Sequence, residues 1–193
     1  MMPTMNKKFN ILIASAFLFA GSIQSAKAQY SENPMTNRRW VNFSNGVNTA
    51  DNLSWQTALT YSKRSDVLMS SARFAYSQEL IEGADDSVTF NKNKIIELGL
   101  MWGESFGGNK WYISAAAGMG LNVRIYGDDI EDTTAFRTVT GVTIGVPVQI
   151  EAGFFINDNW GMNATGVANW NFRQPYVGAH LGVIYRFKKS KSS

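Results

Sequence analysis

The chain has 193 residues, with 18 Lys and Arg, 15 Asp and Glu, one His and no Cys. That length fits one ordinary domain, and the lack of Cys excludes a disulfide framework, a thiolate metal site, a Cys nucleophile and a lipid-anchored Cys. A hydrophobic fraction of 45% with a mean hydropathy of −0.17 excludes a bundle of membrane-spanning helices, and 17 Gly and 12 Phe beside only 4 Pro favour an all-β protein.

The first 28 residues have the pattern of a secretory signal peptide. Lys7 and Lys8 precede a 13-residue apolar run over 9–21, and Ala26-Lys27-Ala28 has the small-x-small form of a signal-peptidase site. The alternative is a membrane anchor, but the run is shorter than the roughly 17–20 residues that span a bilayer. We therefore predict a signal peptide over 1–28.

The basic balance of the chain comes from this leader. A net charge of +3 and a pI near 9.1 would favour a nucleic-acid or anionic partner. Cleavage after Ala28 removes three lysines and no acid, which leaves 15 basic and 15 acidic residues. We therefore predict no nucleic-acid partner.

Apolar and polar residues alternate with period two through the rest of the chain, as in strands that present two different faces. The run 111–126 is the clearest example, since every second residue from Trp111 to Ile125 is apolar. We predict a short lead-in over 29–38, a barrel over 39–187 and a basic polar tail over 188–193. The expected strands are 39–47, 53–63, 66–76, 94–105, 111–126, 138–156, 160–172 and 176–187.

The face opposite the apolar one is rich in Gly, Ser, Thr and Asn and nearly lacks Lys and Glu. Such a face suits a narrow interior better than a water-exposed surface, so the apolar face is predicted to meet lipid. An open sheet edge in hydrocarbon would leave backbone amides unpaired, which makes closure obligatory. The predicted fold is all-β: an eight-stranded antiparallel up-and-down transmembrane β-barrel.

The connections fit the same topology. Short turns near 63–66, 105–110 and 157–159 would lie on the periplasmic side, and two longer loops, 77–93 and 127–137, would face outward. Pro147 lies inside a predicted strand and indicates a bulge or a strand that projects beyond the membrane. The longer loops carry clustered carboxylates without calcium-loop spacing, which favours a hydrated surface in the lipopolysaccharide layer; these are Glu79, Glu82, Asp85, Asp86, Asp128, Asp129, Glu131 and Asp132.

Aromatic residues gather at the predicted strand ends, as expected of two interfacial girdles. At the periplasmic end they are Trp40, Trp102, Phe106, Trp111, Phe155, Trp160, Tyr185 and Phe187. At the outer end they are Trp55, Phe74, Tyr76, Trp170, Phe172 and Tyr176.

The final strand, HLGVIYRF over 180–187, resembles the C-terminal β-signal of bacterial outer-membrane proteins. The matching positions are His180, Gly182, Tyr185 and Phe187. With the leader and the strand count, the chain is similar to small eight-stranded barrels of the OmpA and OmpX type. The resemblance implies a bacterial outer-membrane location and insertion by the barrel-assembly machinery, although the signal usually ends the chain and here a tail follows.

Five ionisable residues are predicted to face the interior as a polar network: Arg73, Glu97, Arg124, Glu151 and His180. Charges inside a narrow barrel must pair, because burying one alone is costly. Arg73 and Glu97 stand at similar heights on adjacent predicted strands, so we expect them to form an ion pair. The favoured interpretation is a plugged barrel, and the alternative is a gated pore.

His180 is the only residue on which a His-dependent hydrolase could rely. The residues two positions away are Gly178 and Gly182, and alternation turns His180 inward, which favours a structural role. We therefore predict no catalytic residue, metal or cofactor, and a structural or surface-interaction role through the outer loops. The alternatives are an outer-membrane lipid-modifying enzyme of deacylase or acyltransferase type, and a secreted soluble ligand-binding barrel of lipocalin type.

Overall fold

A computed structural model describes residues 37–50, 52–82, 88–129, 136–173 and 175–187. The predicted signal peptide over 1–28 and the basic tail over 188–193 lie outside these ranges and stay predictions. Among the described residues, no helix is long and apolar enough to cross a membrane.

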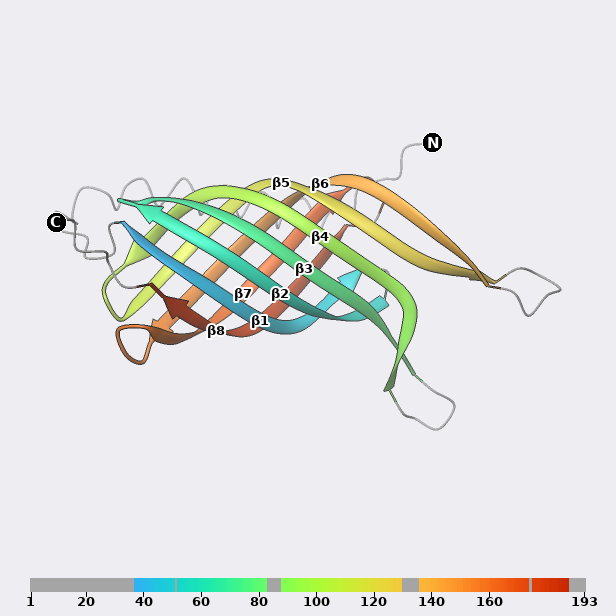
Figure 1. The fold of residues 1–193 in the computed structure, drawn as a ribbon, viewed down its shortest axis with the longest axis horizontal. Helices are drawn as coiled ribbons and strands as arrows, with labels where there is room; N and C mark the ends of the chain where they lie inside the picture. The colour runs from blue at the N-terminus through green and yellow to red at the C-terminus, as the bar shows by residue number, and fades with distance from the viewer. Residues whose placement is uncertain (1–36, 51, 83–87, 130–135, 174, 188–193) are drawn as a thin grey trace, which may run out of the picture. The chain divides into compact units, whose positions relative to one another are not determined.

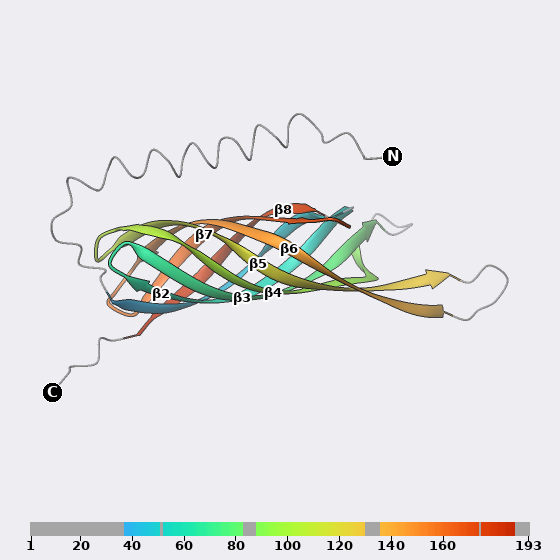
Figure 2. The ribbon, with the colours of Figure 1, turned by 90° about the horizontal axis from the view of Figure 1, so that it is seen from above.

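Eight antiparallel strands pair in sequence order and close on themselves between the first and the last (Figure 1). The view turned by 90° follows the same strands around the barrel (Figure 2). The predicted eight-stranded closed barrel is confirmed. The strands are β1 (Arg38–Ala50), β2 (Asn52–Ser65), β3 (Leu68–Glu82), β4 (Val88–Gly107), β5 (Trp111–Asp129), β6 (Phe136–Phe155), β7 (Trp160–Asn171) and β8 (Tyr176–Arg186).

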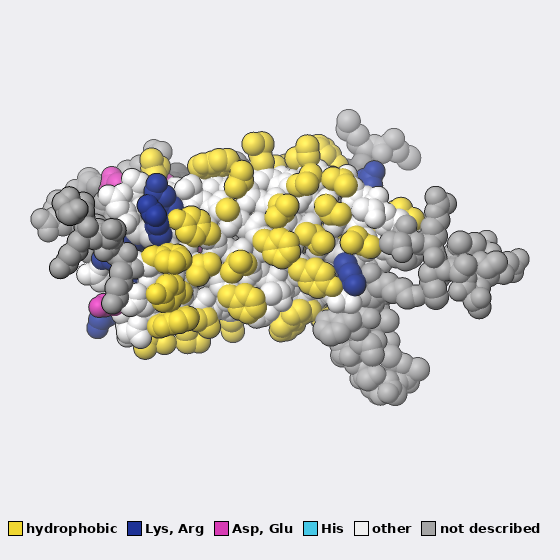
Figure 3. All heavy atoms as spheres, in the orientation of Figure 1, with side chains coloured by type: hydrophobic (Ala, Val, Ile, Leu, Met, Phe, Trp, Pro, Cys, Tyr) yellow, Lys and Arg dark blue, Asp and Glu magenta, His cyan; other side chains and the backbone are white. Residues whose placement is uncertain are grey.

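Side chains alternate between a buried polar face and an exposed apolar face. In β2, Ser54, Gln56 and Thr60 are buried, whereas Leu59 between them is exposed. Hydrophobic side chains cover the middle of the barrel face seen in Figure 3, and Lys and Arg side chains lie toward its two ends. This arrangement is the reverse of the apolar interior that a soluble lipocalin-type barrel requires.

The three predicted short turns lie together at one end of the barrel. The β2–β3 turn consists of Asp66 and Val67, since Ser65 pairs with Leu68, and Asp66 has a φ of 58°. In the β6–β7 turn the Asn157 side-chain oxygen accepts from the backbone N–H groups of Asn159 (3.0 Å) and Trp160 (2.8 Å). These local hydrogen bonds satisfy turn amides that have no partner in the sheet.

The two outward loops are shorter than predicted. Residues 77–93 were expected to form a loop, but β3 continues to Glu82 and β4 begins at Val88, which pair with each other. Likewise Asp129 at the end of β5 pairs with Phe136 at the start of β6. Two strands of a hairpin can stay paired beyond the point where the barrel closes. Polar residues in these segments were therefore still part of strands, although they resembled loops in the sequence.

Pro147 fits inside β6 without a change of register. The β5–β6 ladder pairs Ala117 with Val148 and resumes with Gly120 and Gly145, so the same register holds on both sides. A Cβ added at Gly99 or Gly120 would lie 3.4 Å from Pro147 Cγ. The proline ring therefore occupies the lumen beside two glycines, and no bulge forms at the position where one was predicted.

Three aromatic residues predicted for the girdles point into the barrel instead. Trp40 is fully buried, and Phe155 and Tyr176 are 2% and 3% exposed. Trp40 shares its strand parity with Asn42 and therefore the inward face. By contrast, Trp102, Trp111, Trp160, Phe187, Trp55, Phe74, Trp170 and Phe172 are exposed on the outside.

The backbones of β4 and β5 lie close together at Gly118. A Cβ at Gly118 would overlap the carbonyl oxygen of Leu100 and lie 2.7 Å from Met101 Cα. Gly118→Ala should therefore destabilise the folded barrel by about 1–3 kcal/mol, the usual range for overpacking. Gly108→Ala is the control, because nothing lies within 4 Å of a Cβ there. Urea unfolding in detergent micelles measures both, and equal midpoints would contradict the prediction.

Candidate functional site

Glu97 of β4 is the centre of the larger polar cluster in the barrel interior. Arg73 Nη1 of β3 lies 2.5 Å from Glu97 Oε1, so the expected ion pair forms between two almost fully buried side chains. The other carboxylate oxygen accepts from Asn169 Nδ2 of β7 (2.5 Å) and from the Tyr176 hydroxyl of β8. One carboxylate thus joins partners from three other strands.

Arg73 extends this cluster toward the first two strands. Its Nη2 donates to Gln56 Oε1 at 3.1 Å, and Gln56 Nε2 donates to Ser77 Oγ at 2.7 Å. Asn48 Nδ2 of β1 donates to the same hydroxyl at 3.0 Å. The upper network, defined as these hydrogen-bonded side chains around Arg73 and Glu97, therefore links strands that are far apart in sequence.

Glu151 of β6 forms a second, separate cluster. It accepts from Gln149 Nε2 (2.8 Å), Asn42 Nδ2 (3.1 Å) and the Tyr112 hydroxyl. All three donors are neutral, although the sequence led us to expect interior charges to be paired. Several neutral donors can satisfy a buried carboxyl group, which is the requirement that burial imposes.

His180 belongs to neither cluster. His180 is 3% exposed, and both ring nitrogens lack a hydrogen-bond partner within the described part of the chain. Its ring lies against Gly46 of β1, where a Cβ would overlap it. Arg124 lies farther along β5, with its Cζ 5.2 Å from the ring centroid of Tyr126. Of the five predicted network residues, the structure therefore joins Arg73 and Glu97 directly, and it places Glu151 and His180 outside that pair.

The lumen is filled by apolar side chains near the short-turn end. We call this group the apolar end cluster: Trp40, Met69, Met101, Tyr112, Ala116, Phe155 and Ile184. Arg186 lies over it, with Cζ 4.0 Å from the Phe155 ring centroid and Nε donating to the backbone oxygen of Asp158 at 2.7 Å. Strand parity with Asn42 and Glu151 was the sequence signal that could have placed Trp40 and Phe155 here.

The residues of the predicted β-signal divide between the two faces of β8. Gly182 faces the lumen, where a Cβ would lie 2.5 Å from Asn163 Oδ1 and 2.7 Å from Asn42 Oδ1. Outside, the ring centroid of Tyr185 lies 4.9 Å from that of Trp160 and 5.4 Å from that of Phe187. The glycine therefore permits close packing inside the barrel, and the aromatics form a cluster on the outside near the short-turn end.

The acidic residues of the outward segments are mostly not described. The side chains from Glu82 to Asp86 and from Asp128 to Asp132 lie outside the part that the structure describes. Glu79 is described, and it points into the lumen because β3 continues past it; it accepts from Asn93 Nδ2 at 2.5 Å and from Asn52. Within the described ranges, no three His, Asp or Glu residues gather as a metal site.

No protein-family model and no curated protein matches the sequence. Solved structures do match. Neisserial surface protein A is 12% identical, with a TM-score of 0.57, and the match covers 78% of this chain and 96% of that one. A major outer membrane protein from Thermus thermophilus is 13% identical, with a TM-score of 0.55 and coverage of 77% and 99%.

Ail, the attachment invasion locus protein of Yersinia pestis, was solved in complex with the heparin analogue sucrose octasulfate. It is 11% identical, with a TM-score of 0.53 and coverage of 78% of this chain and 97% of that one. All three comparisons span nearly the whole of the other barrel at low sequence identity. Strand count, closure and connectivity agree with them, so the chain has the fold of the small eight-stranded outer-membrane β-barrels.

Proposed function

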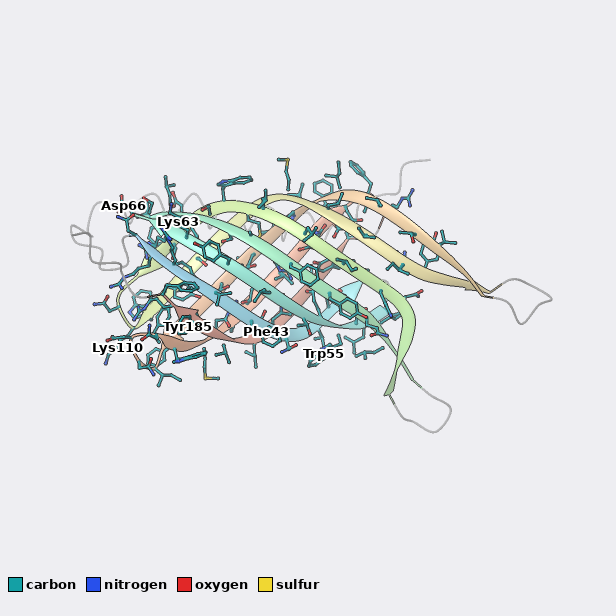
Figure 4. All side chains as sticks on the ribbon, viewed as in Figure 1. Phe43, Trp55, Lys63, Asp66, Lys110 and Tyr185 are labelled. Atoms are coloured by element: carbon teal, nitrogen blue, oxygen red, sulfur yellow. The ribbon has the colours of Figure 1, made fainter. Side chains whose placement is uncertain are left out.

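We propose that this protein resides in the bacterial outer membrane as a non-enzymatic barrel, with a structural or surface-interaction role. The observation that carries the proposal is the exposed apolar belt around a closed barrel with a polar interior. The belt includes the exposed side chains of Phe43, Leu59, Leu98, Met119 and Ile144. Such a continuous apolar surface is unfavourable in water and favourable in hydrocarbon. Phe43 and Trp55 point outward from the barrel surface, and Lys63, Asp66 and Lys110 lie near the short-turn end (Figure 4).

The partners follow from this location. Outer-membrane lipid and lipopolysaccharide would contact the belt, and the barrel-assembly machinery would recognise β8 through His180, Gly182, Tyr185 and Phe187. The segments 77–93 and 127–137 are the proposed interaction surface on the outside. In support, β5 and β6 run out beyond their neighbours at the end away from the short turns (Figure 1).

The interior supports a structural rather than an enzymatic role. A His-dependent lipid-modifying enzyme needs a nucleophile beside the imidazole and access from the lipid. His180 is buried in the lumen, and the register pairs it with Gly46 and Thr165. We propose that the upper network and the apolar end cluster both act as plugs that keep the lumen closed.

The membrane location is tested by fractionation with a matched pair of variants. Wild-type protein should be found in the outer membrane and should migrate differently on electrophoresis with and without boiling. Leu98 and Ile156 are 52% and 67% exposed, but only Leu98 lies in the belt, since Ile156 lies in the β6–β7 turn. Leu98→Arg should cost about 2–4 kcal/mol and reduce the heat-shifted fraction, because the arginine would enter hydrocarbon. Ile156→Arg should have little effect, and a soluble protein that tolerates both would refute the proposal.

A double-mutant cycle tests the structural role of the ion pair. Arg73→Met should destabilise the barrel by about 3–5 kcal/mol, because it leaves Glu97 charged and buried without its cation. Adding Glu97→Gln should recover part of that loss. Lys63→Met is the control, since Lys63 is exposed, and should change stability by less than about 0.5 kcal/mol. Urea unfolding in micelles is measured for the wild type, each single variant including Glu97→Gln alone, the double variant and the control, and additive costs at 73 and 97 would argue against the pair.

Planar-bilayer recording tests the plugged interior. Wild-type protein should give no stable conductance. The double variant Arg73→Met with Glu97→Gln should also stay closed, because the apolar end cluster still fills the lumen near the short turns. A steady current should require removal of bulk there as well, for instance by Trp40→Ala in the same chain. Stable conductance in the wild type would instead favour the gated pore.

A further inference from the structure

A shallow groove of about 590 Å³ lies on the outward face of the barrel, and its lining runs from β1 to β6. We call it the belt groove. Ala72 of β3 lies in it, and the register places Ala72 directly between Tyr61 of β2 and Leu100 of β4. The short alanine side chain therefore leaves a depression between two long ones. The volume is within the roughly 300–1,000 Å³ of pockets for small ligands.

The belt groove is apolar. Arg73 contributes to its lining, but the Arg73 side chain points inward to Glu97. The outward-facing side chains of the lining are all aliphatic or aromatic: Val41, Leu59, Tyr61, Ala72, Phe74, Leu98, Leu100, Met119, Leu121 and Ile144. A groove of this composition within the apolar belt suits a hydrocarbon chain.

Two cations stand where the belt groove approaches the short-turn end. Arg39 of β1 pairs directly with Lys63 of β2, and both side chains are exposed. The next outward pair on this ladder, Val41 with Tyr61, already lines the groove. Two residues of a strand span about 7 Å, which is comparable to the reach from a phosphate through glycerol to an ester carbonyl. In Figure 3, Lys and Arg side chains border the apolar belt toward this end.

The direct pairing of Arg39 with Lys63 is unfavourable by itself, because like charges opposite one another destabilise an antiparallel pair. The neighbours on either side are neutral. Phe187 lies beside Arg39 and donates its backbone N–H to the Arg39 carbonyl oxygen at 3.0 Å. Ser70 of β3 pairs with Lys63 and has an exposed side chain. An anion placed between the two cations would offset their repulsion.

The acidic residues near this end occupy other positions. Asp66, the closest to Lys63 in sequence, lies in the β2–β3 turn (Figure 4). Glu104 of β4 pairs with Leu68 and is two strands away from Lys63. Within the described ranges, no ion pair involves Arg39 or Lys63. The charge of this pair therefore complements an anionic ligand.

We propose that this face binds an anionic glycerophospholipid, with its phosphate between Arg39 and Lys63 and one acyl chain in the belt groove over Ala72. The inference rests on the proposed membrane location, in which the short turns are periplasmic. The two cations then stand at the headgroup level of the periplasmic leaflet, and lipopolysaccharide would meet the opposite end of the barrel. A zwitterionic headgroup suits the site less well, because its own ammonium group would be repelled by both cations.

Native mass spectrometry of the folded protein, released from non-ionic detergent micelles, measures retention of added lipid. One phosphatidylglycerol should bind per barrel, and phosphatidylethanolamine with the same acyl chains should bind more weakly. The double variant Arg39→Gln with Lys63→Gln should weaken phosphatidylglycerol binding about 25-fold, because each cation beside an anionic lipid accounts for about fivefold. Lys110→Gln removes an exposed cation at the same end of the barrel and should bind like the wild type (Figure 4).

A second variant tests the belt groove without changing the charge. Ala72→Phe should weaken phosphatidylglycerol binding at least about tenfold, because the ring would fill the depression between Tyr61 and Leu100. Ala164→Phe makes the same change on the exposed face of β7 and should leave binding unchanged. Heat-shifted electrophoretic mobility shows whether each variant is a folded barrel.

Equal retention of the two phospholipids by the wild type, or wild-type retention by the charge variant and by Ala72→Phe, would overturn the proposal. Preferential retention of lipopolysaccharide, or a second copy of the chain in place of the lipid, would also overturn it. A protein that fractionates with the outer membrane but shows no preference for phosphatidylglycerol would refute this inference alone. A soluble protein would refute the proposed location.

Discussion

Closure of the sheet between β1 and β8 is the constraint on which the other features of this barrel depend. In hydrocarbon each unpaired backbone group costs several kcal/mol, so neither strand could remain an open edge. The ladder runs from Trp40 with Arg186 to Asn48 with Gly178. Gly182 lies within it, where a Cβ would be 2.7 Å from the carbonyl oxygen of Phe43. Strand β8 therefore needs a glycine at position 182 on its inner face, and it presents Tyr185 on its outer face. Both residues belong to the predicted β-signal.

Closure with so few strands also dictates the interior. An eight-stranded barrel leaves room only for side chains, and alternation sends every second residue there. Hydrogen bonds from other side chains then replace water around the buried carboxyl groups. Glu97 achieves this with Arg73 and two further donors, and Glu151 achieves it with neutral donors alone. Because the partners of Glu97 come from β3, β7 and β8, their hydrogen bonds also tie the opposite walls of the barrel together.

Period-two alternation was sufficient to predict the strand number and the inward position of Arg73, Glu97, Glu151 and His180, and closure followed from placing the apolar face in lipid. It failed where two signals competed. Trp40, Phe155 and Tyr176 stand near strand ends, which suggests a girdle, but their parity places them inside, and parity prevailed because it is fixed by the pleat. The hairpin extensions of β3 to β6 have polar sequences that resemble loops, so the pattern did not reveal them. The contact of Tyr112 with Glu151 joins residues on different strands, which one sequence does not reveal.

The two ends of the lumen differ in chemistry, and this difference bears on function. The short-turn end is closed by packed apolar side chains beneath Arg186, whereas the other end has a cavity between two arginines. A solute that enters from the outside would therefore meet the upper network first and then a mainly apolar cluster. The two proposed plugs would therefore act in series along one lumen, because an ion that entered would have to shed its hydration at each of them to go farther.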